Sequence, residues 1–302
     1  MTSGAPAAMR SHVRRATSRW QPSTHVHGTL DEARELIRAA GQVVVLTGAG
    51  ISTGSGVPDY RGPMSIRATP MMYKEFLSDP LARRRYWARN YQGWARLSHA
   101  QPNEGHRALA RWERQGHPGV LLGVITQNVD GLHEAAGNRQ LITLHGRSSD
   151  VVCLRCGRVQ PRVEMQEVMR DLNPGISLLT GVGHAELRPD ADAEVEDWKD
   201  FVVPDCPHCG GLLKPDVTFF GETVPTPRVA ASFAWCEGAG AMLVAGSSLT
   251  VMSGLRFVRR MAHRHASVII INHGFTRGDN LATVRLDGDT TQLLPELVGL
   301  LR

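Results

Sequence analysis

Apolar, β-branched runs alternate with amphipathic segments along most of this chain. The run 43–47, Val-Val-Val-Leu-Thr, is typical of a strand buried on both faces of a parallel sheet. Before it, Thr29 and Glu32 form the pattern of a capping box, and a one-sided apolar helix continues from there to Gly41. The same alternation predicts helices over 103–115 and 254–264, and strands over 120–126, 141–144, 242–245 and 268–271. Strands alternating with helices indicate an α/β fold, a Rossmann-like parallel sheet with helices on both faces.

The segment 151–213 interrupts this alternation. It contains two pairs of cysteines and an acidic stretch over 186–200, and no strong hydrophobic period passes through it. Such a segment cannot bury much core, and small modules of this kind are usually stabilised by a metal or by disulfides. We therefore expect a small domain over 151–213, inserted between the halves 29–150 and 214–302 of one Rossmann-like domain that has a helical region near 62–102.

The positive charge of the chain is concentrated at its start. The formal net charge is +5, and residues 1–28 hold four arginines and no acid, so we expect a disordered basic tail there. The remaining body is close to neutral, and no apolar run approaches the ~20 residues of a membrane helix, so we expect neither a nucleic-acid nor a membrane partner. An arginine-rich, acid-free start also resembles a mitochondrial presequence, so the expected location is cytoplasmic in a bacterium and mitochondrial in a eukaryote.

Four of the five cysteines fall in two pairs, Cys153 with Cys156 and Cys206 with Cys209. Two C-x-x-C pairs predict a closed tetrahedral zinc site, which is structural because no coordination position is left for a substrate. The 49 residues between the pairs exceed the usual ~15–20, and the acidic insertion accounts for the difference. A redox dithiol is the alternative, and Cys236 is expected to be a buried packing residue.

A glycine-rich turn, Gly-Ala-Gly-Ile-Ser-Thr-Gly over 48–54, follows the first buried strand. Glycines at that place let backbone N–H groups approach a phosphate. Thr53 stands where the dinucleotide fingerprint has its third glycine, and the acidic residue expected ~20 positions later is missing. The sequence therefore favours a nucleotide phosphate site over a dehydrogenase, with a plain glycine turn as the alternative.

Polar side chains follow two further predicted strands. Gln127, Asn128 and Asp130 come after the strand 120–126, and His145 comes after the strand 141–144. Ligands of open parallel sheets bind at the carboxyl ends of the strands, where amides and a carboxylate can hold a polar ligand and a histidine can act as a general base near neutral pH. Capping and turn formation are the alternative for Asn128 and Asp130, and His133 is expected to be a surface or packing residue.

The second half of the chain adds two more features. An extended apolar run over 214–222 offers an edge to which a substrate peptide can add as a strand, with an internal strand as the alternative. Small and polar residues over 246–248 and 272–274 end the two predicted strands there, and they suit a ribose and an adenine. Turn chemistry is again the alternative.

Together these motifs resemble the sirtuins, a family of NAD-dependent protein-lysine deacylases. The matching motifs occur in the family's order at 48–52, 58–61, 127–130, 144–146, 153–156, 206–209, 219–222, 246–248 and 272. The resemblance covers about residues 29–300, and the segments 85–90 and 212–216 and the long zinc insertion are most similar to the class II branch, which includes the mitochondrial sirtuin 4 type.

The resemblance implies a role for each matching position. It implies that His145 is the catalytic base, that Asn128 and Asp130 assist at the nicotinamide and ribose, and that the four paired cysteines bind zinc. The NAD-binding residues it implies are Gly48, Ala49, Gly50, Ser52, Asp59, Tyr60, Arg61, Gln127, Asn128, Val129, Asp130, Gly246, Ser247, Ser248, Asn272, His273, Gly274 and Thr283. The acyl-lysine peptide would lie between residues 251–254 and the residues Val217, Phe219, Phe220, Gly221 and Glu222.

The reaction that the resemblance implies consumes NAD and moves no hydride. The acyl oxygen of the lysine would attack C1′ of the ribose as nicotinamide leaves, and a hydroxyl activated by His145 would then take the acyl group, which ends on ADP-ribose. The implied partners are acyl-lysine proteins or peptides, and NAD and Zn²⁺ are the implied cofactors. Transfer of ADP-ribose to a protein is the alternative, because it begins with the same release of nicotinamide. Tyr73 is followed by Phe76 where succinyl- and malonyl-preferring members have Tyr-x-x-Arg, so we do not expect a dicarboxylate acyl group.

Overall fold

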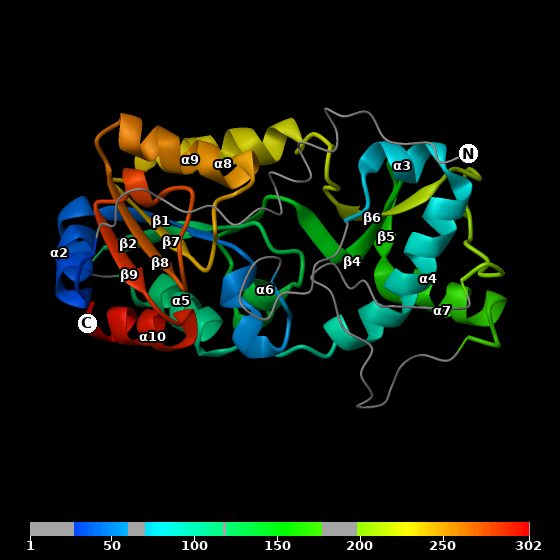
Figure 1. Ribbon diagram of the computed structural model, residues 1–302, viewed down its shortest axis with the longest axis horizontal. Coiled ribbons are helices and arrows are strands. Elements are labelled where there is room, and N and C mark those ends of the chain that lie inside the picture. Colours follow the sequence, from blue (N-terminus) through cyan, green and yellow to red (C-terminus); the bar gives the residue numbers. More distant parts are fainter. Residues whose placement is uncertain (1–26, 60–69, 117–118, 177–197, 302) are drawn as a thin grey trace.

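The computed structural model describes residues 27–59, 70–116, 119–176 and 198–301. They form a larger domain around a parallel sheet and a smaller module beside it, at the left and right of Figure 1. The five segments that lie outside these ranges include Tyr60 and Arg61, two of the expected NAD-binding residues, and most of the expected basic tail. Within the described residues, no helix has the length and apolar character needed to cross a bilayer.

The larger domain is built on six parallel strands. In spatial order they are β3 (Leu141–Thr143), β2 (Val120–Thr126), β1 (Gln42–Thr47), β7 (Ala241–Ala245), β8 (Ser267–Asn272) and β9 (Val284–Asp287). The chain moves outward from β1 to β3 on one side and then returns to build β7 to β9 on the other. The connections that leave β1 and β7 therefore run toward opposite edges of the sheet, so a topological switch point lies between these two central strands.

Helices cover both faces of this sheet, as the alternation in the sequence predicted (Figure 1). The side chains of Val43 and Val45 pack on one face with α2 (Leu30–Ala40), α5 (Glu104–Gln115) and α10 (Thr290–Leu300). Those of Val44 and Leu46 pack on the other face with α8 (Thr226–Gly238) and α9 (Met252–His263). Consecutive residues of β1 thus enter opposite cores, which is why Val43 to Leu46 are all apolar.

The smaller module is an antiparallel sheet of three strands. Its order is β5 (Val159–Pro161), β4 (Gly146–Cys153), β6 (Leu213–Val217), and it packs with α3 (Tyr73–Ser78), α4 (Pro80–Leu97) and α7 (Arg162–Leu172). This sheet extends beyond the small domain expected over 151–213, because β4 begins at Gly146 and β6 ends at Val217. The helix α7 was not expected, because only Met165 and Met169, one turn apart, give it an apolar face.

Short elements connect the strands to the site. Two 3-10 turns, η1 (Ala49–Ile51) and η2 (Thr53–Ser55), follow β1, and α6 (Leu132–Ala136) follows the loop after β2. A third, η3 (Asp279–Leu281), precedes β9. The capping box at the start of α2 is confirmed, since the Thr29 hydroxyl accepts from the Glu32 N–H at 3.2 Å and the Glu32 carboxylate accepts from the Thr29 N–H at 2.7 Å.

Candidate active site

The loops after β1 and β7 meet at the topological switch point of the sheet. Ligands of open α/β sheets bind outside the carboxyl ends of the strands at such a point. The Gly50 N–H donates to the Gly246 carbonyl at 2.8 Å, and Gly246 has a φ of +63°. A Cβ on Gly246 would lie 2.3 Å from the Ile51 nitrogen. Direct backbone contact between the two loops is therefore a second reason for glycine here, beside the approach to a phosphate that the sequence suggested.

Ser52, Asn128 and Asp130 converge beside these loops. The Ser52 hydroxyl donates to the Asp130 carboxylate at 2.7 Å, and the Asn128 amide donates to the Ser52 oxygen at 3.0 Å and to the Gly48 carbonyl at 3.1 Å. Asp130 also accepts from the Leu132 N–H at 3.0 Å at the start of α6. The capping role that was the alternative for Asp130 is therefore present. The same hydrogen bonds also hold the Asn128 amide and the Asp130 carboxylate at the edge of the sheet.

His145 follows β3 at the same edge and is half-buried. Its Nδ1 lies 2.9 Å from the Gln127 carbonyl oxygen, which only accepts, so Nδ1 carries the proton. Nε2 then accepts from the Ser253 hydroxyl at 2.8 Å. Burial lowers the pKa of His145 to about 4, because it outweighs the backbone hydrogen bond to Gln127, which raises the pKa, and the charges of Arg256 and Arg228 act in the same direction as burial. The imidazole is therefore neutral at neutral pH, and its Nε2 lone pair can take a proton.

Two buried histidines lie beneath Ser52. The rings of His106 and His133 are in edge contact with centroids 4.9 Å apart. His106 Nε2 is 3.4 Å from the Ser52 oxygen, and His133 Nε2 is 2.9 Å from the Thr47 hydroxyl. Burial lowers the pKa of His106 to about 2 and also lowers that of His133. His133 was expected to be a surface or packing residue, and it packs. His106 was not among the predicted site residues; the signal that could have found it is its place three residues after the helix cap Asn103.

The loops after β8 and β9 form the far end of the same edge. The Asn272 amide donates to the His273 and Gly274 carbonyls at 3.0 Å each, and the Gly274 N–H donates to the Asp287 carboxylate at 3.1 Å. Asp287, which ends β9, is a polar residue of this edge that was not among the predicted site residues. Ser248 contacts the Thr250 hydroxyl at 3.1 Å in the loop after β7.

Other expected NAD-binding residues differ in where the structure places them. The Ser247 hydroxyl donates to the Gln127 side chain at 2.6 Å, so these two belong to the edge. Asp59 is half-buried at the end of a described segment, and the Val129 carbonyl accepts from the Ser148 hydroxyl at 2.6 Å. Thr283 is the exception. It is exposed and accepts from the Val268 N–H at 3.0 Å at the opposite end of β8, so the structure does not bring it to the site.

The strand end expected to hold a peptide lies next to His145. The Thr218 N–H donates to the His145 carbonyl at 2.7 Å. Gly146 makes this approach possible, because its φ is +89° and a Cβ would lie 1.8 Å from the Asp216 oxygen. The end of β6 and the histidine are therefore fixed relative to each other by backbone contacts.

Several side chains over 217–222 pack against, or form hydrogen bonds with, other residues of the protein. The Phe219 ring packs at 5.1 Å from Phe76 and from Tyr86. The Glu222 carboxylate accepts from the Phe219 N–H at 2.8 Å and from the buried Lys214 ammonium at 3.1 Å. Val217 is buried, whereas Phe220 is half-buried and Gly221 exposed. What this segment offers a peptide is therefore mainly its backbone.

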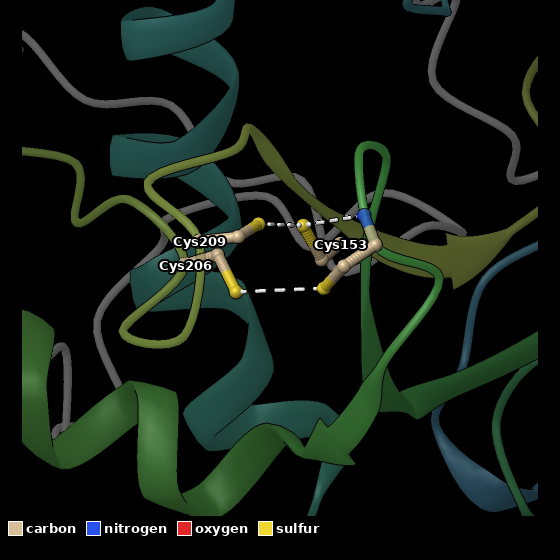
Figure 2. A group of neighbouring side chains, drawn as sticks. Cys153, Cys206 and Cys209 are labelled. Atoms are coloured by element: carbon tan, nitrogen blue, oxygen red, sulfur yellow. Dashed lines mark hydrogen bonds between the residues drawn. The ribbon is translucent and has the colours of Figure 1, made fainter.

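The four paired cysteines meet between the ends of β4 and β6 (Figure 2). Their sulfur atoms all lie within 4.8 Å of one another, with Cys153 to Cys209 at 3.5 Å and Cys156 to Cys206 at 3.9 Å. A tetrahedral Zn²⁺ with Zn–S bonds of ~2.3 Å requires sulfurs about 3.8 Å apart, and disulfides would bring them to ~2.05 Å. The donor set therefore fits a closed zinc site. Cys236 lies on the buried face of α8 and packs in the core, as expected.

Comparison with known proteins identifies the class. Residues 48–253 match the model of the Sir2 family, and the chain belongs to this family. It is 49% identical over 266 residues to an NAD-dependent protein deacetylase 1 of Mycobacterium avium, an alignment that covers 87% of this chain and 93% of the relative. It is 50% identical over 279 residues to an NAD-dependent protein deacetylase 1 of Streptomyces coelicolor, covering 90% and 91%. An NAD-dependent protein deacylase SIR4 of Batrachochytrium dendrobatidis is 43% identical over 284 residues, covering 88% and 92%.

Solved structures agree with this assignment. A Sir2 protein with a p53 peptide and NAD⁺ superimposes with a TM-score of 0.71 at 28% identity, covering 90% of this chain and 98% of the other. A Sir2 protein bound to an acetylated peptide gives a TM-score of 0.70 at 26% identity with the same coverage. The family, the α/β fold and the zinc-compatible cysteine cluster that the sequence predicted are thus confirmed.

Proposed function

We propose that this protein is an NAD-dependent protein-lysine deacylase that transfers an acyl group from lysine to ADP-ribose and releases nicotinamide. The observation that carries the proposal is His145, a neutral imidazole at the carboxyl edge of the sheet, beside a strand end that can accept a peptide. The names of the bacterial and fungal relatives support the activity, and the solved Sir2 complexes with NAD⁺ and with acetylated peptide support the choice of substrates.

Each residue then has a chemical task. NAD, when bound, supplies an electrophilic ribose carbon from which nicotinamide departs. Asn128 and Asp130, held by Ser52, would bind the nicotinamide carboxamide and the ribose and so orient the bond that breaks. His145 Nε2 takes the proton of a ribose hydroxyl, while the Gln127 carbonyl keeps Nδ1 protonated and the ring oriented.

The other loops at this edge of the sheet serve the two substrates. The loop at 48–52 would hold the phosphates of NAD, and the loops at 246–248 and 272–274 would hold its adenosine half. The backbone over 217–221 pairs with the acyl-lysine peptide as an added strand. Zinc has a structural task, because the four thiolates close its coordination shell and join the ends of β4 and β6.

The finer assignments are part of the same proposal. The class II branch is supported by the fungal relative named a deacylase SIR4. Phe76, buried at the position that holds Arg in the succinyl- and malonyl-preferring members, favours an uncharged acyl chain. A cytoplasmic location, or a mitochondrial one in a eukaryote, and the absence of nucleic-acid and membrane partners stay predictions of the sequence.

A panel of acyl-lysine peptides tests the proposal. The enzyme, NAD and each peptide are incubated, and nicotinamide and all peptide masses are measured. Free lysine with O-acyl-ADP-ribose is the expected product. A peptide that gains ADP-ribose instead would indicate the transferase alternative, and nicotinamide release that no peptide and no acyl chain can raise would contradict the deacylase.

A further inference from the structure

Ser253 lies in the segment 251–254 that the resemblance assigns to the peptide, and no step of the proposed reaction uses its hydroxyl. It is the second residue of α9 and is half-buried. The first turn of α9 has no side-chain cap, so the hydroxyl does not serve the helix. Instead it lies 2.8 Å from His145 Nε2. The neighbouring Gly254 packs against the Gln127 side chain, where an added Cβ would come within 2.7 Å, so the start of α9 is seated tightly on this part of the site.

The contact has the geometry of a nucleophile with its base. Because the Gln127 carbonyl can only accept, the proton of His145 resides on Nδ1, and Nε2 must accept from the Ser253 hydroxyl. A hydroxyl bound to a neutral imidazole, whose other nitrogen is oriented by a third group, is the arrangement that activates serine nucleophiles. The burial that lowers the pKa of His145 keeps that lone pair free of a proton at neutral pH.

We propose that Ser253 is a self-modification site, which accepts ADP-ribose when NAD is bound without an acyl-lysine. This inference rests on the proposed function, since it requires the cleavage of NAD beside His145. The reacting ribose must come within reach of Nε2 for deacylation, and Ser253 already occupies that nitrogen. With the acyl-lysine absent, the Ser253 oxygen is the protein nucleophile held at the base.

The step is balanced without any further reactant. A bond forms between Ser253 Oγ and C1′ of the ribose, and the bond from C1′ to the nicotinamide nitrogen breaks. Nicotinamide leaves with the electron pair of that bond as a neutral molecule, and the Oγ proton passes to His145 Nε2 and then to solvent. The product is an O-glycoside, in which an acetal joins ADP-ribose to Ser253, and it occupies the position of the acyl-lysine. The modified enzyme is therefore inactive until the group is removed.

The test is a mass measurement on the whole protein and its peptides. The full-length, zinc-loaded enzyme is incubated with NAD alone and with NAD plus an acyl-lysine peptide that it deacylates. One ADP-ribosyl group is expected on the peptide that contains Ser253 after NAD alone, and at least tenfold less when the acyl-lysine peptide is present. Ser253→Ala should lose the adduct, while Ser267→Ala, at the far end of the sheet, should keep it.

Two further measurements make the result decisive. His145→Ala should lower the rate of adduct formation about 100-fold or more, as expected for loss of a general base. Thermal unfolding of each variant checks that the fold is retained. Cleavage of NAD with no adduct, or with an adduct that persists in Ser253→Ala, would overturn the inference and leave the deacylase intact. No nicotinamide release under any condition would overturn both.

Discussion

The parallel sheet domain and the small module bury their residues in different ways. In β1 the four residues Val43 to Leu46 have no exposed surface, and they are enclosed by helices on both faces. The small module closes its core with aromatic rings, with Arg162 stacked at 4.9 Å over Trp87, and with the cysteine cluster. Of the nine exposed large apolar side chains in the described residues, seven lie on this module, α3 and α4 included. The stability of the small module therefore depends on contacts other than apolar burial, among them the cysteine cluster.

Removing the metal should destabilise the small module far more than the parallel sheet domain, and this is the largest effect expected. Structural zinc contributes roughly 10 kcal/mol or more of apparent binding free energy, which is folding free energy for a module of this kind. Chelation is expected to raise hydrogen exchange in β4 and β6 first, with β1 and β7 still protected. Cys206→Ala should do the same, and Cys236→Ala should keep its zinc. A zinc-free protein with unchanged exchange would show that the four cysteines are not a metal site.

Replacing His145 should separate chemistry from stability. Loss of a general base costs about 100- to 10,000-fold in rate, so His145→Ala should lose nearly all NAD-dependent deacylation of an acyl-lysine peptide. The same change should leave zinc content unchanged, and NAD should still raise the melting temperature. His263→Ala, an exposed histidine on α9, is the matched control. Unchanged turnover in His145→Ala would remove this residue from the mechanism.

A pair of apolar truncations should cost different amounts of unfolding free energy in the two regions. Leu243 is fully buried in β7, and Leu→Ala in such a core costs about 2–5 kcal/mol in the free energy of unfolding. Val168 on α7 is 46% exposed, so Val168→Ala should change that free energy by less than about 0.5 kcal/mol. Urea unfolding measures both. Equal losses in the free energy of unfolding would mean that the side chain on α7 contributes as much burial to the small module as the one on β7 contributes to the sheet domain.

The buried histidines predict an acid-sensitive sheet domain. The pKa of His106 is lowered from 6.5 to about 2, so the folded state resists its protonation while the unfolded state accepts a proton below about pH 6.5. This contribution to stability is present above pH 6.5 and is lost as the pH falls, by up to about 1.4 kcal/mol per pH unit. Urea unfolding at pH 7, 6 and 5 measures the slope. His106→Asn should flatten it and His99→Asn, an exposed histidine, should not; equal slopes would contradict the assignment.

Local pattern was sufficient for much of this protein. The apolar runs predicted the strands near their observed bounds, since a strand buried on both faces allows no polar residue, and the capping box placed the start of α2. The C-x-x-C spacing predicted the metal cluster because two residues between cysteines let both sulfurs reach one ion. The joint order of short motifs identified the family, although each motif alone also suits a turn.

Only the tertiary structure decided which groups face each other. Ser253 and His145 are 108 positions apart and Ser52 and Asp130 are 78 apart, and no local rule states that the chain will bring such pairs together. The order of the strands placed Thr283 at the wrong end of β8 for the site, and the packing of α5 on α6 buried His106 against His133. Periodicity determines which face of an element is buried, whereas the contacts between distant elements determine the protonation and the partners of the groups that react.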